Sequence, residues 1–260
     1  MSIPSETATA WIRAVEDPLT PIAELETILT ALADVTIDDP LKLELYSLIA
    51  AHPHAPFGAL EVVLYDESFR NLAAIVARNP KTPARILENL MRSEDWHICR
   101  GIALNPATPR SVLEALADSY NAELMENPAL AEDMESARRE DLAPEQLAVL
   151  AQSPFSGIRK IMAENSKIPI RVLEQLAQDQ DWQVRLAVAN HPKTPAPVLA
   201  MLADDQDPAD EDCLIPLAVA RNPTTPRAAL EKLLQYEWEG VPVNEVRIAA
   251  THHLESIAKR

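Results

Sequence analysis

One phrase decides how this chain folds: NHPKTPAPVLAMLA, which runs from Asn190 to Ala203. Close copies are RNPKTPARILENLM from Arg78, LNPATPRSVLEALA from Leu104 and RNPTTPRAALEKLL from Arg221. Each copy has two prolines three residues apart, then a pair of apolar residues, and another apolar residue three positions later. A phrase that recurs in this way is typical of proteins built from tandem structural repeats.

Looser copies complete a periodic series. They begin at Glu16, Ala51, Arg139 and Glu164. When all eight are aligned on the second proline, or on Ala143 where that proline is missing, the intervals are 35, 27, 26, 34, 26, 26 and 31 residues. This pattern indicates a unit of about 26 residues with loop insertions. We therefore expect a single repeat domain over residues 1–260, with about eight units between 17 and 254 and an insertion of uncertain register at 119–142.

The chemistry of the phrase predicts where helices end and begin. The first proline disfavours helical geometry in the residue before it, so the preceding helix is expected to stop there. The second proline is expected at the first position of the next helix, where its missing N–H costs nothing. The threonine before it is expected to cap that helix by accepting a backbone N–H. The four threonines are Thr82, Thr108, Thr194 and Thr225.

The other half of each unit also repeats. It reads EDWHICRGIALN from Glu94 and QDWQVRLAVANH from Gln180. Apolar residues recur four positions apart in both, at Ile98 and Ile102 and at Val184 and Val188. That spacing predicts a second short helix with one apolar face. Each unit is thus a hairpin of two short helices, and the fold is expected to be all-α.

The combined pattern, NPxTPxxVLxxLAxDxDWxVRxAVA, resembles the leucine-rich repeat variant (LRV) family of bacterial proteins. The resemblance implies a right-handed solenoid of alternating α and 3-10 helices without strands. The founding type of that family binds an iron–sulfur centre through an N-terminal cysteine cluster. This chain has only Cys99 and Cys213, too few for a four-cysteine cluster, so no cofactor is expected.

Composition narrows the function classes. With 40 acidic and 23 basic residues the net charge is −17, which opposes binding to nucleic acids and to anionic membranes. The chain contains 4 glycines and no glycine-rich phosphate motif, which excludes Rossmann and P-loop folds. It has no apolar run long enough to span a membrane and no export signal in its first residues. We expect a cytoplasmic protein.

Five residues are candidates for partner binding. Trp96 and Trp182 occupy equivalent positions, where they would suit the apolar groups of a partner or would simply cover the hairpin turn. Arg159, Arg185 and Arg247 also share one position. They form either a row that receives a partner's carboxylates or a set of internal ion pairs.

Other polar clusters point less clearly to chemistry. The acidic stretch from Asp204 to Asp212 lacks the glycine and spacing of a calcium loop and is interpreted as a solvated loop or a contact for a basic partner. His52 with His54, and His252 with His253, lack further ligands for zinc. Cys99 is expected to be a plain thiol. No catalytic, cofactor-binding or metal-binding residue is predicted.

Two function classes remain. The first is a non-catalytic scaffold that binds a protein or peptide along the surface of the repeats, and the acidic charge would suit a basic one. The alternative is an enzyme on a helical-repeat frame, resembling a cofactor lyase or, less favoured by the charge, a DNA glycosylase. A basic trough with a buried carboxylate would favour the enzyme, and an acidic or neutral groove would favour the scaffold.

Overall fold

The computed structural model describes residues 4–35, 40–65, 71–237 and 244–259. Within these ranges every regular element is a helix and none is a strand, so the prediction of an all-α fold is confirmed. The chain divides into two compact units, residues 1–131 and 132–260, and each is described by itself. That one continuous solenoid spans residues 1–260 stays a prediction.

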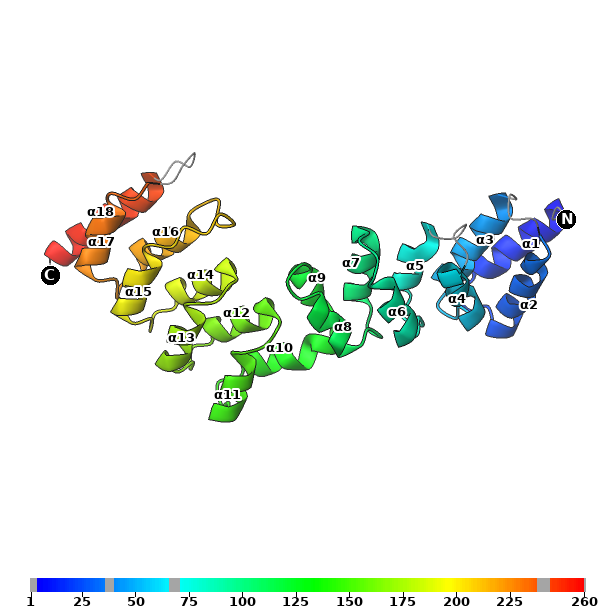
Figure 1. The fold of residues 1–260 in the computed structure, drawn as a ribbon, viewed down its shortest axis with the longest axis horizontal. Coiled ribbons are helices and arrows are strands. Elements are labelled where there is room, and N and C mark those ends of the chain that lie inside the picture. The colour runs from blue at the N-terminus through cyan, green and yellow to red at the C-terminus, as the bar shows by residue number, and fades with distance from the viewer. Residues whose placement is uncertain (1–3, 36–39, 66–70, 238–243, 260) are drawn as a thin grey trace. The chain divides into compact units, whose positions relative to one another are not determined.

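The first unit contains nine short α-helices and one 3-10 turn among its described residues (Figure 1). Their bounds are α1 (Ser5–Glu16), α2 (Ile22–Ala33), α3 (Pro40–Ala51), α4 (Phe57–Tyr65), α5 (Ala73–Arg78), α6 (Ala84–Leu90), α7 (Trp96–Leu104), α8 (Arg110–Ala115), α9 (Asn121–Leu124) and the 3-10 turn η2 (Pro128–Leu130).

The second unit continues the alternation. Its described helices are α10 (Ala131–Arg138), at whose first residue the two units divide, α11 (Pro144–Leu150), α12 (Ser156–Glu164), α13 (Ile170–Leu176), α14 (Trp182–Asn190), α15 (Ala196–Leu202), α16 (Leu214–Arg221), α17 (Arg227–Leu233) and α18 (Asn244–Ala258).

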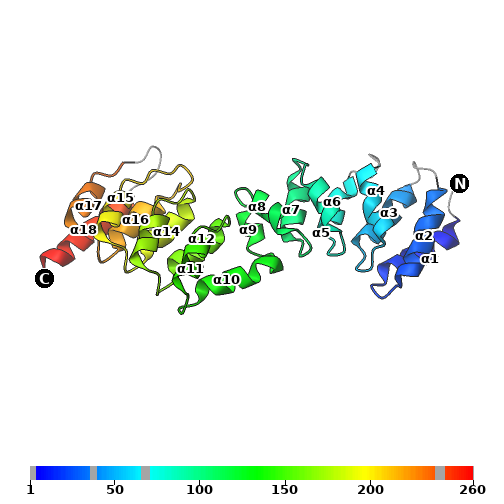
Figure 2. The same cartoon turned by 60° about the horizontal axis from the view of Figure 1, so that its bottom comes forward.

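The helices of each unit form two layers. We call A helices those that follow the second proline position of the repeat (α2, α4, α6, α8, α11, α13, α15 and α17) and B helices the others. B helices contact B helices of neighbouring repeats, as in the series α1, α3, α5, α7 of the first unit and α12, α14, α16, α18 of the second (Figure 2). A helices pack against the B helices before and after them, so each repeat is covered by its neighbours.

The core lies between the two layers and is made of aliphatic side chains. The apolar pair of each A helix is buried, as at Ile86 and Leu87 or at Val198 and Leu199. In the B helices small residues allow close approach. A Cβ added at Gly101 would lie 2.9 Å from the Cβ of Ala77 on the preceding B helix. The interior therefore needs no aromatic ring in most repeats.

The turn between a B helix and the next A helix differs from the expectation in one respect. The second prolines stand at the N-cap positions rather than at the first helical residues, and no side chain caps these helices. The threonine hydroxyls instead donate to the carbonyl six residues earlier, in the last turn of the preceding helix. These bonds join Thr82 to Val76 (2.5 Å), Thr108 to Ile102 (2.7 Å), Thr194 to Val188 (2.5 Å) and Thr225 to Val219 (2.6 Å).

The predicted stop before the first proline is confirmed. Asn79, Asn105 and Asn222 end their helices in extended geometry, as does His191 in the same position. This is the geometry that a following proline favours.

A buried asparagine in this turn joins one repeat to the one before. Asn222 donates its amide to the carbonyls of Ala189 (2.7 Å) and His191 (3.0 Å), and its Oδ1 accepts the N–H of Thr224 (3.1 Å). The same three contacts recur at equivalent positions, and we call these residues the turn asparagines. They are Asn79, Asn105 and Asn127 in the first unit and Asn165 and Asn222 in the second.

The structure resolves the register of residues 119–142. After Asn127 the position of an A helix holds only the 3-10 turn η2, and α10 follows at once. Asn165 donates to the carbonyls of Ala137 (2.9 Å) and Arg139 (2.7 Å), which marks α10 as a B helix. The irregularity is therefore two B helices in succession with most of one A helix missing.

Candidate functional site

The two predicted tryptophans begin equivalent B helices. Asp95 precedes Trp96 and caps α7 by accepting the N–H groups of His97 (2.8 Å) and Ile98 (3.3 Å). Asp181 caps α14 in the same way before Trp182. Trp96 is 51% exposed, with the guanidinium of Arg100 at 5.5 Å from the ring centroid, whereas Trp182 is half-buried. A binding role for either ring stays a prediction.

The predicted arginine row makes internal contacts. Arg159 forms a two-pronged ion pair with Asp179 at 2.7 and 2.8 Å. Arg185 pairs in the same way with Asp205 at 2.6 Å and reaches Asp207 at 2.7 Å. Each arginine thus lies on a B helix and each aspartate in the turn that follows the next A helix. These pairs fasten the two helices of one repeat to the following turn.

Two further residues, Arg247 and Cys99, occupy the position equivalent to Arg159 and Arg185, and both also make contacts within the chain. The guanidinium of Arg247 donates to the carbonyl of Tyr236 at 2.8 Å and lies 3.9 Å from the carboxylate of Glu237. Cys99 stands where the arginines stand elsewhere, and its thiol contacts the carbonyl of Ser93 at 3.2 Å. The arginines are therefore engaged within the chain, and their contact with a partner's acidic groups stays a prediction.

The acidic stretch after α15 is largely exposed, as predicted, but several of its carboxylates also make contacts within the chain. Asp210 is buried and caps α16 by accepting the N–H groups of Leu214 and Ile215, both at 2.8 Å. Asp205 and Asp207 hold Arg185, and Asp204 pairs with Lys232. The hydrogen bond from Arg185 lowers the pKa of Asp207. The negative charge that appeared free in the sequence is largely used in folding the turn.

His52 and His191 take the place of a turn asparagine. Nδ1 of His52 accepts the N–H of His54 (2.9 Å), and its Nε2 contacts the carbonyl of Asp17 (2.9 Å). Nδ1 of His191 accepts the N–H of Lys193 (3.2 Å), but its buried Nε2 has no hydrogen-bond partner among the described residues. No group of three or more potential metal ligands exists in the described part of the chain.

A buried thiol also has an internal role. Cys213 stands before α16 with a left-handed φ of 53°, and its side chain hydrogen-bonds with Tyr236. Burial raises the pKa of the Cys213 thiol and that of the Tyr236 phenol. A thiol held protonated in this way is a poor nucleophile.

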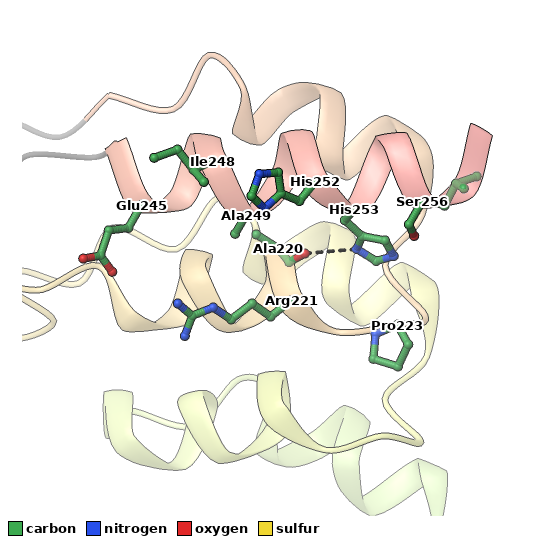
Figure 3. A pocket seen from close by; sticks show the side chains of 10 residues that line it. Ala220, Arg221, Pro223, Glu245, Ile248, Ala249, His252, His253 and Ser256 are labelled. Carbon is green, nitrogen blue, oxygen red and sulfur yellow. Dashed lines mark hydrogen bonds between the residues drawn. The ribbon is translucent and has the colours of Figure 1, made fainter. Parts of the chain in front are cut away.

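A hollow of the second unit lies between α16 and α18 (Figure 3). It has a volume of about 690 Å³. We call it the α16–α18 groove. Its lining residues are Ala220, Arg221, Pro223, Glu245, Ile248, Ala249, His252, His253, Ser256 and Ile257.

One face of α18 forms most of this groove. Ile248 and Ala249 each lie three or four residues from Glu245 and from His252, and Ser256 lies four beyond His252, so the five residues share one side of the helix. Ile248 is 54% exposed and Ile257 is 37% exposed, although both are large apolar residues. The groove is therefore an accessible surface on which apolar side chains alternate with polar and charged ones.

A hydrogen bond between α18 and α16 lies at the floor of the groove. His253 stands in the position of a turn asparagine, and its Nδ1 contacts the carbonyl of Ala220 at 3.0 Å (Figure 3). Because a carbonyl only accepts, Nδ1 of His253 carries the proton. Arg221 and Glu245 lie toward one end of the groove, and His252 is exposed along it.

Sequence reasoning missed this groove. The signal was present as the i, i+3, i+4 pattern of α18, but His252 and His253 were considered only as metal ligands. The groove exists because Ile248 is exposed, whereas Leu217, its equivalent on α16, is buried. That difference depends on packing and is not visible in the sequence.

One segment of the second unit matches a known family of repeat proteins. The family model described as leucine rich repeat variant matches residues 182–207. Residues 182–207 are an LRV repeat. The match confirms the resemblance found in the sequence over one full unit of the array. No curated protein and no solved structure shows a significant match to the chain.

The LRV repeat at 182–207 contains α14, α15 and the turn up to Asp207. It therefore begins at Trp182 and includes Arg185 with both of its aspartate partners. The ion pair closes the repeat on itself. None of the helices in the described ranges has the length and apolar character needed to cross a bilayer.

Proposed function

We propose that this chain is a non-catalytic interaction module that binds a segment of a protein partner in the α16–α18 groove. The observation that carries the proposal is the exposure of Ile248 and Ile257 inside a groove of about 690 Å³. Large apolar side chains clustered in a hollow are characteristic of binding surfaces, because exposed apolar area is otherwise minimised. Helical-repeat proteins commonly bind partners along such surfaces.

The form of the groove favours a peptide or helix as the ligand. It is open and elongated along α18, and its apolar residues recur at helical spacing. Ile248 and Ile257 are nine residues apart on α18, so an amphipathic segment with apolar side chains at i and i+8, about 12 Å apart, would place one anchor near each. Because the chain carries a net charge of −17, partners with basic residues beside those anchors would associate faster.

A non-catalytic role agrees with the use of the ionisable groups in the LRV repeat. Arg185, Asp205 and Asp207 are bound to one another, and the thiol of Cys213 has a raised pKa because it is buried. These groups support the fold. We therefore favour the interaction module over an enzyme on a helical-repeat frame.

A pair of matched substitutions tests the proposal. Ile248→Asp places a charge in the groove, and Ile170→Asp places the same charge on α13 at a site of equal exposure, 53% compared with 54%. Proteins captured from the host lysate by the wild-type chain would be identified by mass spectrometry and compared with those captured by each variant.

We expect the principal partner to be lost with Ile248→Asp and kept with Ile170→Asp. Both variants should retain the helical circular dichroism of the wild type, because neither residue is buried. A partner that binds all three proteins equally would contradict the groove as the binding site.

A further inference from the structure

His191 occupies a position that asparagine holds in most repeats, and the two side chains differ in one property. Asparagine accepts the N–H two residues later through Oδ1, and His191 makes the same contact to Lys193 through Nδ1 at 3.2 Å. The amide of asparagine cannot titrate, but an imidazole can. One contact of the array therefore depends on the protonation state of a side chain.

The hydrogen bonds fix the form of the ring. Since the N–H of Lys193 donates to Nδ1, that nitrogen is unprotonated and the proton lies on Nε2. Nε2 is buried and makes no well-aligned hydrogen bond to any residue that the structure describes, although the ring interacts with the carbonyl of Asn165 in the preceding repeat. His52 shows what a satisfied ring does at the same position, because its Nε2 contacts the carbonyl of Asp17 at 2.9 Å.

Protonation would give the ring a second N–H, at Nδ1, which would point directly at the N–H of Lys193. The turn from His191 to Thr194 would then lose a hydrogen bond and gain a repulsion between two donors. Protonation would also place a positive charge on the His191 side chain, which is only 5% exposed. Both effects favour the neutral ring in the folded protein.

The surroundings of the ring act in the same direction. Burial lowers the pKa of His191, the positive charge of Lys193 lowers it further, and the carbonyl of Asn165 in the preceding repeat opposes these effects only in part. The following repeat presents the neutral amide of Asn222 to the carbonyl of His191. The charged group that acts on the ring is thus Lys193, from its own turn.

We propose that His191 makes an acid-sensitive contact in the turn between α14 and α15, intact when its ring is neutral and released when the ring is protonated. The sign follows from linkage. A histidine whose pKa is lower in the folded state than in the unfolded state contributes stability that is complete above the ordinary histidine pKa, near 6.5. That stability is lost as the pH falls from there toward the pKa of the folded state. Because Asn222 binds the carbonyl of His191, the turn that precedes the α16–α18 groove shares in the loss.

Thermal unfolding of the full chain at pH 7.5 and at pH 5.0 tests the proposal. The variant is His191→Asn, which installs the side chain used by the other repeats. The control is His97→Asn, which removes an exposed histidine. The acidic residues titrate in all three proteins, so their contribution cancels in the comparison.

We expect the Tm of the wild type and of His97→Asn to fall between the two pH values by at least about 2 °C more than the Tm of His191→Asn. Equal falls in the wild type and in His191→Asn would overturn the proposal.

The wild-type chain provides a second test that does not depend on a variant. Nitrogen-15 spectra of the His191 ring at pH 7.5 should show the tautomer with the proton on Nε2. Base-catalysed amide exchange slows as the pH falls. Between pH 7.5 and pH 5.0 the amide of Lys193 should slow less than this, because it loses its protecting hydrogen bond. A ring protonated on Nδ1 at pH 7.5, or no loss of protection at Lys193, would overturn the proposal.

Discussion

The turn threonines show how one side chain can join two helices. Thr194 is 1% exposed, and its hydroxyl donates to the carbonyl of Val188 at the end of α14 while its own residue begins the path into α15. The hydroxyl thus acts at the C-terminal end of one helix and not at the N-terminal end of the next. A threonine before a proline is compatible with both roles, so the sequence alone could not separate them.

Thr194→Val keeps the shape of the side chain and removes this hydrogen bond. We expect the free energy of unfolding to fall by about 1 kcal/mol, the usual contribution of one buried hydrogen bond. Thr251→Val on the exposed side of α18 is the matched control and should change it by less than about 0.5 kcal/mol. Urea denaturation measures both, and equal losses would contradict the contact.

The paired arginines are a second feature of residue scale. In Arg185→Met two carboxylates remain in a half-buried turn without their cation, because Asp205 and Asp207 both depend on that guanidinium. We expect a loss of about 3–5 kcal/mol, as is usual when one partner of a buried pair is removed. Arg227→Met removes an exposed partner of Glu231 and should cost about 0.5 kcal/mol or less. Similar losses in the two variants, measured by urea denaturation, would contradict the assigned role of Arg185.

Much of the residue-level chemistry was ambiguous in the sequence for a definite reason. The repeat period placed Arg159, Arg185 and Arg247 in one row, but the aspartates that the first two contact lie 20 residues further along the chain, and Arg247 contacts the carbonyl of Tyr236 instead. Asp210 appeared solvated because it lies in an acidic run, although it caps a helix. Periodicity predicts which residues are equivalent and does not predict which polar groups meet.

At the scale of the helix, the sequence predicted more. The stripe of each A helix and the end of each B helix follow from the apolar spacing and from the prolines, and both are confirmed. The exception is residues 119–142, which the sequence marked only as an insertion of uncertain register. Only three residues take a helical turn there before α10 begins, because the apolar stripe that would bury an A helix is missing.

Leu199 tests the interior of one A helix. Its side chain is fully buried in α15, so Leu199→Ala should lower the free energy of unfolding by about 2–5 kcal/mol. Met201→Ala on the same helix removes a residue that is 42% exposed and should cost less than about 1 kcal/mol. Equal small losses in urea denaturation would show that Leu199 does not face the core.

At the scale of the whole molecule, the chain comprises two compact units whose helices contact those of neighbouring repeats. In such an array stability is approximately a sum over repeats and their nearest neighbours. The two units also differ in their repeats, since the match to the LRV family lies in the second. Unfolding need not be a single transition.

Fluorescence can follow each unit separately. A variant that keeps only Trp96 reports on the first unit, and one that keeps only Trp182 reports on the second, with phenylalanine at the other tryptophan positions. We expect the two midpoints in urea to differ, while far-ultraviolet circular dichroism of each variant shows both transitions. Coincident midpoints in fluorescence and circular dichroism would contradict independent units.

Buried turn asparagines join most repeats to the one before. Asn222 is 4% exposed and donates to two carbonyls of the preceding turn, whereas Asn190 is exposed and donates only within its own helix. The most direct measurement is the free energy of unfolding of Asn222→Ala beside that of Asn190→Ala. The account predicts a loss of about 2–3 kcal/mol for Asn222→Ala and less than about 0.5 kcal/mol for Asn190→Ala. Losses of equal size would contradict it.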